Sequence, residues 1–236
     1  MISVCMATYN GERFLKEQLE SILSQLDEHD ELIVSDDGSR DNTLSIISSY
    51  NDKRIRLLHN TNHGVTHNFE NALSSSKGDV ICLADQDDVW RPGKIEFVKR
   101  TMQKYDLVVH NADVVDGSGN SLGYDYFSLT PQGKGFWGNL WKSRFLGCCM
   151  AFNRKLLDDA LPFPGLAVGH DYWIGMLGAA KYKVLFDKKI FLSYRRHGNN
   201  VSTSAEPSDT SWFYKLFEKR CSILLCVIIR YFNKTK

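Results

Sequence analysis

The sequence predicts an α/β fold in which a mostly parallel central sheet carries helices on both faces and a helical tail follows at the C-terminus. Two observations lead to this prediction. Short apolar runs, typical of strands buried on both faces, alternate with segments whose apolar residues recur at helical spacing. The connections between them are short, and this alternation favours parallel strands joined by right-handed crossovers.

Four strand-like runs, each followed by a helical segment, make up the first part of the chain. We expect these strands at residues 2–7, 32–34, 55–58 and 80–84. The helical segments that follow them lie within 15–26, 41–50, 69–73 and 92–105. Ligands of such sheets bind beyond the carboxyl ends of the strands, so the residues that come directly after each strand form the candidate site.

The rest of the chain is less regular. We expect further strands at 107–110, 114–115, 184–186 and 190–192, and helices within 156–161 and 169–177. The segment 123–142 is rich in glycine, serine and aromatic residues and is expected to be an irregular loop. No long linker is visible, so we expect one domain over 1–205 and a basic amphipathic tail over 206–236.

Composition and charge narrow the possible partners. The net charge of +1 does not favour nucleic acid, but from Lys181 onward there are 12 Lys and Arg residues and 4 Asp and Glu residues, which favours anionic surfaces or phosphates.

The six cysteines form no CxxC pair, as expected for reduced thiols of a cytoplasmic protein. Met1 leads directly into a strand, so we expect no signal peptide, and the apolar run Ile223 to Ile229 is too short to span a bilayer.

The stretch that organises the chain is the apolar run Val80 to Ala84, which leads straight into Asp85, Asp87 and Asp88. Carboxylates gathered at one strand end repel one another, so we expect a cation among them. Mg²⁺ and Mn²⁺ take oxygen ligands, and Mg²⁺ is commonly held by one or two carboxylates together with substrate phosphates. The hypothesis is a site for a divalent ion and a diphosphate. The alternative is an acidic turn solvated at the surface.

Two other strand ends carry polar residues. Thr8 and Tyr9 follow the first strand, and Asp36 and Asp37 follow the second. Because parallel strands end at the same edge of a sheet, we expect these residues near the acidic stretch.

Asp171 lies at the start of a predicted helix, directly after His170. A carboxylate in this position either caps backbone amides or, within hydrogen-bond reach of an acceptor hydroxyl, acts as a general base. His170 is equally consistent with packing.

Three cationic or titratable residues, Arg195, Arg196 and His197, follow the last strand. They form a solvated basic turn, or they neutralise a diphosphate leaving group, with His197 as a further candidate ligand of the metal. His63 and His67 have the i, i+4 spacing of helical zinc ligands, but no third ligand accompanies them, which disfavours a metal role.

The segment 123–149 is the least patterned part of the chain. Trp137 and Trp141 either line an acceptor site or pack in the interior. Cys148 and Cys149 are interpreted as core residues.

The stretch from Trp212 to Phe232 combines basic residues, aromatics and a short apolar run. This combination is typical of a helix that lies in a membrane interface, with Lys and Arg on anionic head groups. The alternative is a helix docked on the body of the protein or on a second subunit.

Five motifs, in order along the chain, resemble those of family 2 glycosyltransferases of the GT-A (Rossmann-like) fold. They are Thr8 to Gly11, Asp36 to Ser39, Asp85 to Trp90, His170 to Trp173, and Tyr194 to His197 with Asn200 to Ser202. The resemblance covers roughly residues 2 to 202 and is greatest to bacterial rhamnosyltransferase-like members that build O-antigen or capsular polysaccharide. His170-Asp171 in place of Glu-Asp, and the Tyr-Arg-x-His pattern ending at His197, are associated with that group.

The resemblance implies a role for each motif. The residues implied to bind the nucleotide base are Thr8, Tyr9 and Asn10, together with Asp36 or Asp37. Asp85 is implied to bind the ribose. Asp87 is implied to bind a Mg²⁺ or Mn²⁺ ion, and Arg195 and Arg196 to bind the diphosphate. Asp171 is implied to be the catalytic base, with His170 and Trp173 on the acceptor side.

The implied reaction is a single displacement that inverts the anomeric carbon of a sugar carried by a nucleoside diphosphate. The implied partners are dTDP-L-rhamnose as candidate donor and a lipid-linked glycan as acceptor, and the implied location is the inner face of the bacterial cytoplasmic membrane. Two alternatives remain: a sugar-nucleotide-binding protein without turnover, and a receiver-type regulatory domain, which also places an acidic pair and Mg²⁺ after a strand.

Overall fold

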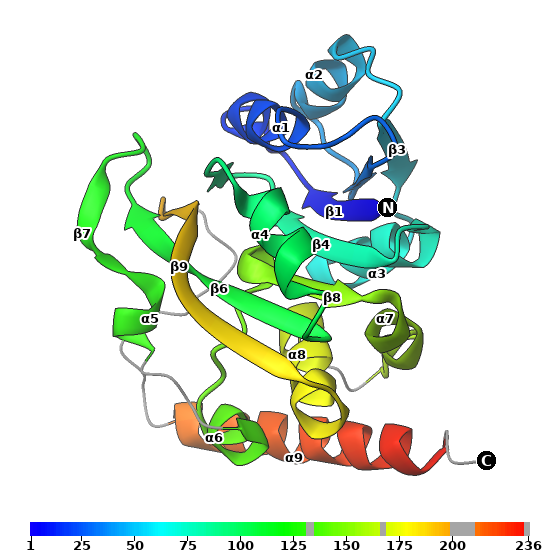
Figure 1. Ribbon diagram of the computed structural model, residues 1–236, viewed down its shortest axis with the longest axis vertical. Helices are drawn as coiled ribbons and strands as arrows, with labels where there is room; N and C mark the ends of the chain where they lie inside the picture. The colour runs from blue at the N-terminus through cyan, green and yellow to red at the C-terminus, as the bar shows by residue number, and fades with distance from the viewer. Residues whose placement is uncertain (131–134, 166–168, 199–210, 234–236) are drawn as a thin grey trace.

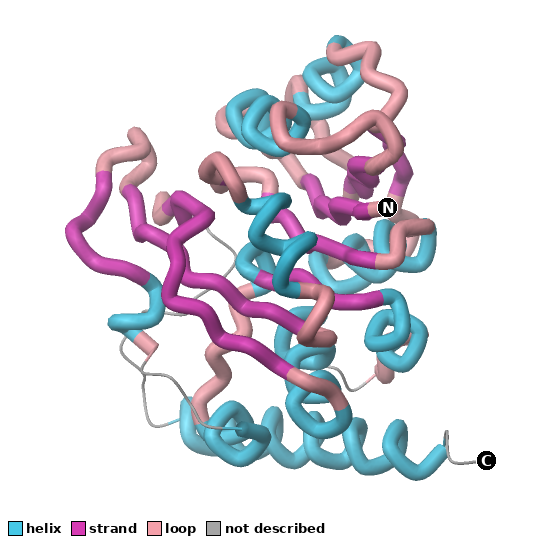
Figure 2. The backbone as a smooth tube through the Cα atoms, in the orientation of Figure 1, coloured by secondary structure: helices cyan, strands magenta, loops and turns pink. Residues whose placement is uncertain are grey.

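The computed structural model describes residues 1–130, 135–165, 169–198 and 211–233. Within them, nine strands form one mixed sheet in the order β3-β2-β1-β4-β8-β6-β9-β5, with β7 paired to β6 outside this path (Figure 1). The sheet is strongly twisted, and its two ends lie at different heights in the view of Figure 2.

The first half of the sheet is parallel, as the sequence predicts. Its strands are β1 (Ile2–Thr8), β2 (Glu31–Asp36), β3 (Ile55–His59) and β4 (Val80–Asp85). The helices between them are α1 (Leu15–Leu23), α2 (Thr43–Ser49) and α3 (Val65–Ser75). Strands β1, β2 and β4 are almost fully buried, which explains why their apolar residues do not alternate with polar ones.

The second half of the sheet mixes directions. β8 (Met150–Asn153) is inserted antiparallel between β4 and β6 (Leu107–Val115), and β9 (Val184–Arg195) runs parallel to β6. The short strands β5 (Val89–Trp90) and β7 (Ser121–Asp125) add antiparallel edges. The helices here are α4 (Lys94–Thr101), α5 (Tyr126–Leu129), α6 (Gly135–Trp141), α7 (Arg154–Ala160) and α8 (His170–Lys181), with a 3₁₀ turn, η1 (Gly147–Cys149).

Two expectations for this half are wrong. The pairs of strands expected at 107–115 and 184–192 are single long strands, because β6 and β9 pair along their whole length. A shift of register between His110 and Asn111 accommodates the polar Lys188 and Lys189. The segment 123–142, expected to be irregular, contains the end of β7 and helices α5 and α6 in its described part. Tertiary pairing overrides the weak local signal at both places.

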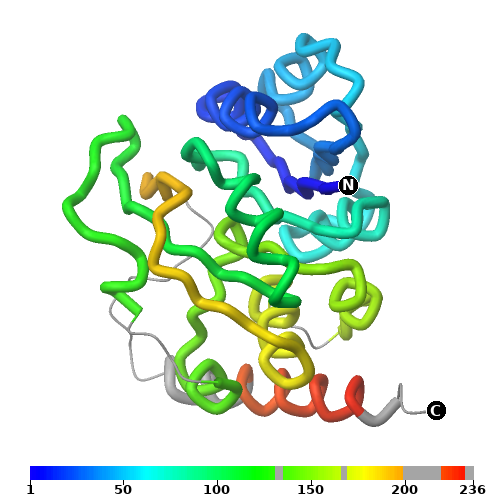
Figure 3. Tube along the Cα trace, in the orientation of Figure 1, coloured from blue at the N-terminus to red at the C-terminus, as the bar shows by residue number. Residues whose placement is uncertain are grey.

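Helix α9 (Ser211–Asn233) lies across one end of the molecule beside α6 and α8 (Figure 3). Ile223, Cys226 and Val227 face inward and are buried. Arg230 donates to the carbonyl oxygens of Leu161 at 2.8 Å and Pro162 at 2.6 Å. The tail is therefore docked on the body, one of the two alternatives that its sequence left open.

The opposite face of α9 is apolar and exposed. Leu225, Ile228 and Ile229, spaced i, i+3 and i+4, are each between 45% and 48% exposed. Among the described residues, no helix combines the length and the hydrophobicity needed to cross a bilayer.

Candidate active site

The turn after β2 is built around Asp36. Its carboxylate is buried and accepts hydrogen bonds from the amides of Gly38 at 3.0 Å and Ser39 at 2.8 Å and from the hydroxyl of Thr8 at 3.1 Å. With these partners inside the protein, Asp36 and Thr8 fix the shape of the turn. The resemblance implies that Asp36 or Asp37 contacts the nucleotide base. In the structure, the carboxylate of Asp36 is hydrogen-bonded within its own turn and to Thr8.

Asp37 joins the same turn to the loop before α3. It accepts hydrogen bonds from the side-chain amide of Asn60 at 2.8 Å and the backbone amide of Gly64 at 2.8 Å, and it lies 3.2 Å from Nδ1 of His63. Gly64 has a φ of 96°, a conformation that favours glycine. His63 therefore pairs with Asp37, and it does not join His67 in a metal site.

The turn after β1 is tied to the acidic stretch by Gln86. The side-chain amide of Gln86 accepts from the backbone amide of Tyr9 and donates to its carbonyl oxygen, both at 3.0 Å. Tyr9 is 52% exposed, and the side chain of Asn10 accepts from the amide of Arg40 at 2.8 Å. Three strand ends therefore meet, as the sequence predicts.

Asp85 lies at the end of β4, beside two other carboxylates. Burial, with the charges of Asp87 and Asp171 as further causes, raises its pKa to about 7. Asp171 comes from α8, 86 positions later in the chain (171 minus 85). Its Cβ lies beside Gly147, and Asp85 lies beside Cys148, so both acids are next to η1.

The turn that carries Asp87 is held by the end of β9. The imidazole Nε2 of His197 lies 2.8 Å from Oδ2 of Asp87, and its ring packs 4.8 Å from that of Phe14. At this distance the two side chains are in direct hydrogen-bond contact. A carboxylate oxygen and an imidazole nitrogen are both ligands that Mn²⁺ accepts. The donor set therefore fits the ion that the sequence implies.

Arg195 holds the backbone of this turn. Its Nε donates to the carbonyl oxygen of Asp87 at 2.9 Å, its Nη2 to Glu17 at 2.7 Å and its Nη1 to the carbonyl oxygen of Gly117 at 3.3 Å. Its own amide donates to Oδ1 of Asp88 at 2.9 Å. The side chain is 4% exposed, so Arg195 supports the turn, whereas the sequence suggested contact with a diphosphate. Arg196 is half-buried next to it.

Asp171 lies in the first turn of α8. The N-cap of this helix is Gly169, with a φ of 92°, and Oδ1 of Asp171 accepts from the amide of Tyr172 at 2.7 Å. Its Cβ lies close to Gly147, 3.4 Å from the place where a Cβ on that glycine would sit. Gly147 therefore leaves room beside the candidate base.

The two residues expected on the acceptor side are buried. Trp173 is fully buried and its indole donates to the carbonyl oxygen of Ala160 at 3.0 Å, so its position corrects the expectation that it contacts an acceptor. The ring of His170 stacks on Phe69 with centroids 3.8 Å apart, and burial lowers its pKa. Within the described residues, neither ring nitrogen of His170 has a hydrogen-bond partner.

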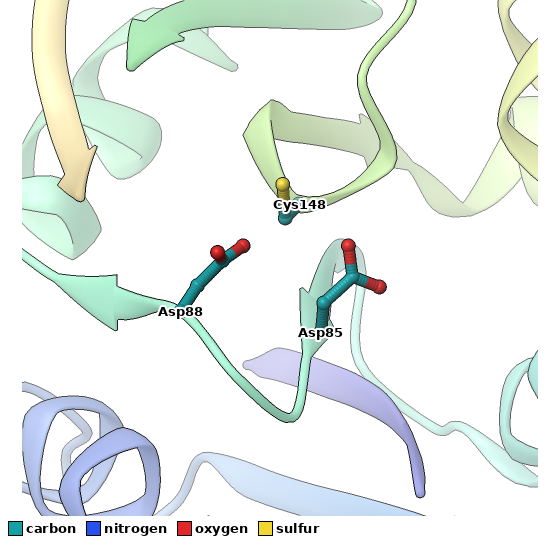
Figure 4. Close-up of side chains that lie close together, drawn as sticks. All are labelled: Asp85, Asp88 and Cys148. Carbon is teal, nitrogen blue, oxygen red and sulfur yellow. The ribbon is translucent and has the colours of Figure 1, made fainter. Parts of the chain in front are cut away.

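Sequence reasoning missed two residues of this region. Asp88 was noted in the acidic stretch without a role, and Cys148 was interpreted as core. Figure 4 shows both residues next to Asp85, and one ligand atom from each of the three lies within 4.8 Å of the others. No local signal could identify Cys148, because its approach depends on the insertion of β8 beside β4.

The comparison with protein families decides the class of this chain. Residues 3–161 match the family described as glycosyl transferase family 2. The chain belongs to glycosyltransferase family 2. The receiver-type alternative is therefore excluded.

Relatives of this family 2 glycosyltransferase include an uncharacterized glycosyltransferase of Nostoc, 28% identical over 86% of this chain and 67% of the relative. The dTDP-rhamnosyl transferase RfbG of Shigella flexneri is 27% identical over 83% of this chain and 72% of the relative. An uncharacterized glycosyltransferase of Rickettsia felis is 28% identical, and the match covers only 38% of its length. The chain thus spans between about two fifths and three quarters of the length of these three relatives.

Two solved structures have the same fold. TarS of Staphylococcus aureus, residues 1–349 in complex with UDP, superposes with a TM-score of 0.70 at 19% identity over 95% of this chain and 65% of that chain. Glucosyl-3-phosphoglycerate synthase of Mycobacterium tuberculosis, in complex with Mn²⁺, UDP and glucosyl-3-phosphoglycerate, has a TM-score of 0.63 at 17% identity over 96% of this chain and 79% of that chain. These likenesses confirm the GT-A fold of the family 2 glycosyltransferase.

Proposed function

We propose that this family 2 glycosyltransferase moves a sugar from a nucleoside diphosphate to a hydroxyl of a growing, lipid-linked bacterial surface glycan, with inversion at the anomeric carbon. The observation that carries the proposal is the position of Asp85 and Asp171 beside the same turn, η1: Asp85 lies close to Cys148, and the Cβ of Asp171 lies close to Gly147. One group of acids faces a donor and its cation, and one faces an acceptor, which a displacement requires.

The donor half of the site is formed by the first three strand ends. Tyr9 offers an exposed ring to the base, Asp37 follows the turn fixed by Asp36, and Asp85 is placed for the ribose. Asp87, with His197, would hold Mg²⁺ or Mn²⁺, as the Mn²⁺ complex of the mycobacterial neighbour supports. When bound, such an ion stabilises the charge that develops on the departing diphosphate.

The acceptor half is formed by Asp171. One oxygen accepts the amide of Tyr172, which fixes the carboxylate, and the other oxygen is the one assigned to the proton of the attacking hydroxyl. The hydroxyl then displaces the diphosphate from the opposite face of the sugar. A positioned base of this kind contributes roughly 10²- to 10⁴-fold to the rate.

We also infer the donor and location from the relatives and the surface. The likeness to RfbG favours dTDP-L-rhamnose as donor. The exposed apolar face of α9, with Lys219 exposed on the same helix, favours contact with an anionic membrane, where a lipid-linked acceptor resides. In this proposal residues 1–205 form the catalytic unit and 206–236 the attachment.

Incubation with a panel of nucleotide sugars and Mn²⁺ tests the proposal. We expect slow hydrolysis of one donor, abolished by Asp171→Asn, while binding of the nucleoside diphosphate to that variant stays within several-fold of the wild type. Asp79→Asn, at a surface carboxylate, is the matched control and keeps the rate. If Asp171→Asn retains most of the activity, Asp171 is not the base. Binding of a donor that no acceptor or water ever consumes would favour a sugar-nucleotide-binding protein without turnover.

A further inference from the structure

A second group of metal-binding side chains lies on the inner side of the acidic turn. One carboxylate oxygen each of Asp85 and Asp88 and the Sγ of Cys148 lie within 4.8 Å of one another. Figure 4 shows the two carboxylates pointing toward the sulfur, which comes from η1 beside β8. Asp87 is not a member of this group, because its Oδ2 faces His197 at 2.8 Å.

Asp88 supplies an observation that points to a ligand. The residue is 1% exposed, and its Oδ1 accepts the amide of Arg195 at 2.9 Å. Its Oδ2 is buried and has no hydrogen-bond partner within the part of the chain that the structure describes. A buried carboxylate oxygen without a partner is costly, so this oxygen favours a cation or a proton beside it. The site therefore lacks a positive charge or a proton.

The donor set selects the kind of ion. A thiolate with two carboxylates suits Zn²⁺ and similar thiophilic ions, whereas Mg²⁺ prefers oxygen ligands alone. Around one Zn²⁺, a sulfur at about 2.3 Å and an oxygen at about 2.1 Å lie roughly 3.6 Å apart in a tetrahedron. Since the three ligand atoms already lie within 4.8 Å of one another, small side-chain rotations complete the geometry.

The surroundings of the site include one further charged group. Lys94 is fully buried, donates to the carbonyl oxygen of Cys148 at 2.8 Å and lies 3.9 Å from the ring centroid of Trp90. Asp85 is only half-buried, whereas Asp88 and Cys148 are buried.

We propose that Asp85, Asp88 and Cys148 form a binding site for one thiophilic divalent cation of the Zn²⁺ type, distinct from the site at Asp87 and His197. Binding converts the thiol to a thiolate and releases its proton to solvent. An ion held there engages Asp85, which the donor nucleotide needs, so Zn²⁺ inhibits nucleotide binding. The cation site itself does not depend on the proposed transferase reaction.

Titration with Cd²⁺ tests the site directly, because a cadmium thiolate has an ultraviolet charge-transfer band that no oxygen-only site produces. The exposed Cys221 is first replaced by serine to remove a surface thiol. In this background we expect a band that saturates at one equivalent of Cd²⁺, disappears in Cys148→Ser and persists in Cys149→Ser, the neighbouring buried thiol. Asp88→Asn, which keeps an oxygen for the amide of Arg195, weakens Cd²⁺ binding by about tenfold or more.

The outcomes separate the possibilities. A band of full intensity in Cys148→Ser, no band in the Cys221→Ser background, or unchanged affinity in Asp88→Asn each overturns the proposal. Circular dichroism confirms that each variant is folded, and Asp88→Asn gives an independent answer if the cysteine variant is not. Calorimetry with nucleoside diphosphate in the presence and absence of Zn²⁺ tests the inhibition, and equal affinities contradict it, whatever the transferase assay gives.

Discussion

Nε2 of His197 lies 2.8 Å from Oδ2 of Asp87, although 110 residues separate them. The contact joins the turn after β4 to the end of β9, the two places where the sequence shows its acidic and basic motifs. Neither motif by itself forms a complete cation site. Their meeting explains why a charge-rich turn can be held in one geometry before substrate arrives.

The first prediction concerns this pair. Asp87→Asn and His197→Ala each weaken Mn²⁺ binding, by about 10- to 100-fold, because each removes one ligand or the partner that orients it. Electron paramagnetic resonance of Mn²⁺ measures the free ion directly. EDTA is expected to abolish nucleotide binding or weaken it strongly, and equal nucleotide affinity with and without EDTA would falsify the ion's role at the diphosphate.

The second prediction concerns Glu17, which no motif includes. Glu17 pairs with Arg195 at 2.7 Å, and Arg195 in turn holds the carbonyl oxygen of Asp87. Glu17→Gln is expected to lower Mn²⁺ affinity several-fold, up to about tenfold, because the turn loses part of its support. The pair itself contributes little to folding, since Glu17 is 60% exposed.

The control for Glu17 is Glu20→Gln, on the same helix but outside the turn. Arg195→Lys keeps the charge and loses the planar fork, so it should lower Mn²⁺ affinity further than Glu17→Gln does. A fall in the melting temperature without a fall in Mn²⁺ affinity would assign Glu17 and Arg195 to folding alone.

The third prediction is a pH dependence of stability. Burial lowers the pKa of His170 below its usual 6.5, so below that pH the unfolded chain binds a proton that the folded protein resists. The stabilising effect of a neutral His170 is present above pH 6.5 and is lost as the pH falls below it. Urea unfolding at pH 7.5, 6 and 5, values on either side of about 6.5, measures this loss.

His170→Phe keeps the stacking on Phe69 and removes the titration, so its free energy of unfolding should decrease less over the same range. His29→Gln, at an exposed histidine, should behave as the wild type does. Parallel curves for His170→Phe and the wild type would show that another group causes the acid sensitivity.

The fourth prediction concerns the outward face of α9. Replacing Leu225 and Ile229 with glutamate should reduce flotation with anionic liposomes by about tenfold or more, because each side chain contributes the transfer energy of a buried aliphatic group. Leu122→Glu, at a similarly exposed leucine on β7, is the matched control. Flotation unaffected by the double substitution, or absent in the wild type, would remove the membrane from the proposal.

The part of the candidate site that lies at the ends of strands could be predicted from the sequence. Thr8, Asp36 and Asp85 end three parallel strands that pair in register, so reading the strands from their apolar runs also located these residues. The orientation of the side chains was not predictable. Asp36 turns inward to its own loop and to Thr8 on the neighbouring strand. Asp37 reaches the loop before α3, and Trp173 packs in the core against Ala160, so these orientations depend on residues from other elements.

The sequence by itself determined the alternation of strands and helices, the acids at the strand ends and the motifs that mark the family, because apolar periodicity and turn chemistry are local. Only the tertiary structure decided that β8 enters the sheet antiparallel and brings Cys148 to Asp88, and that β9 runs on without a break to bring His197 to Asp87. The physical reason is that the pairing of strands far apart in the sequence depends on the packing of the whole core, which cannot be predicted from any short stretch of residues.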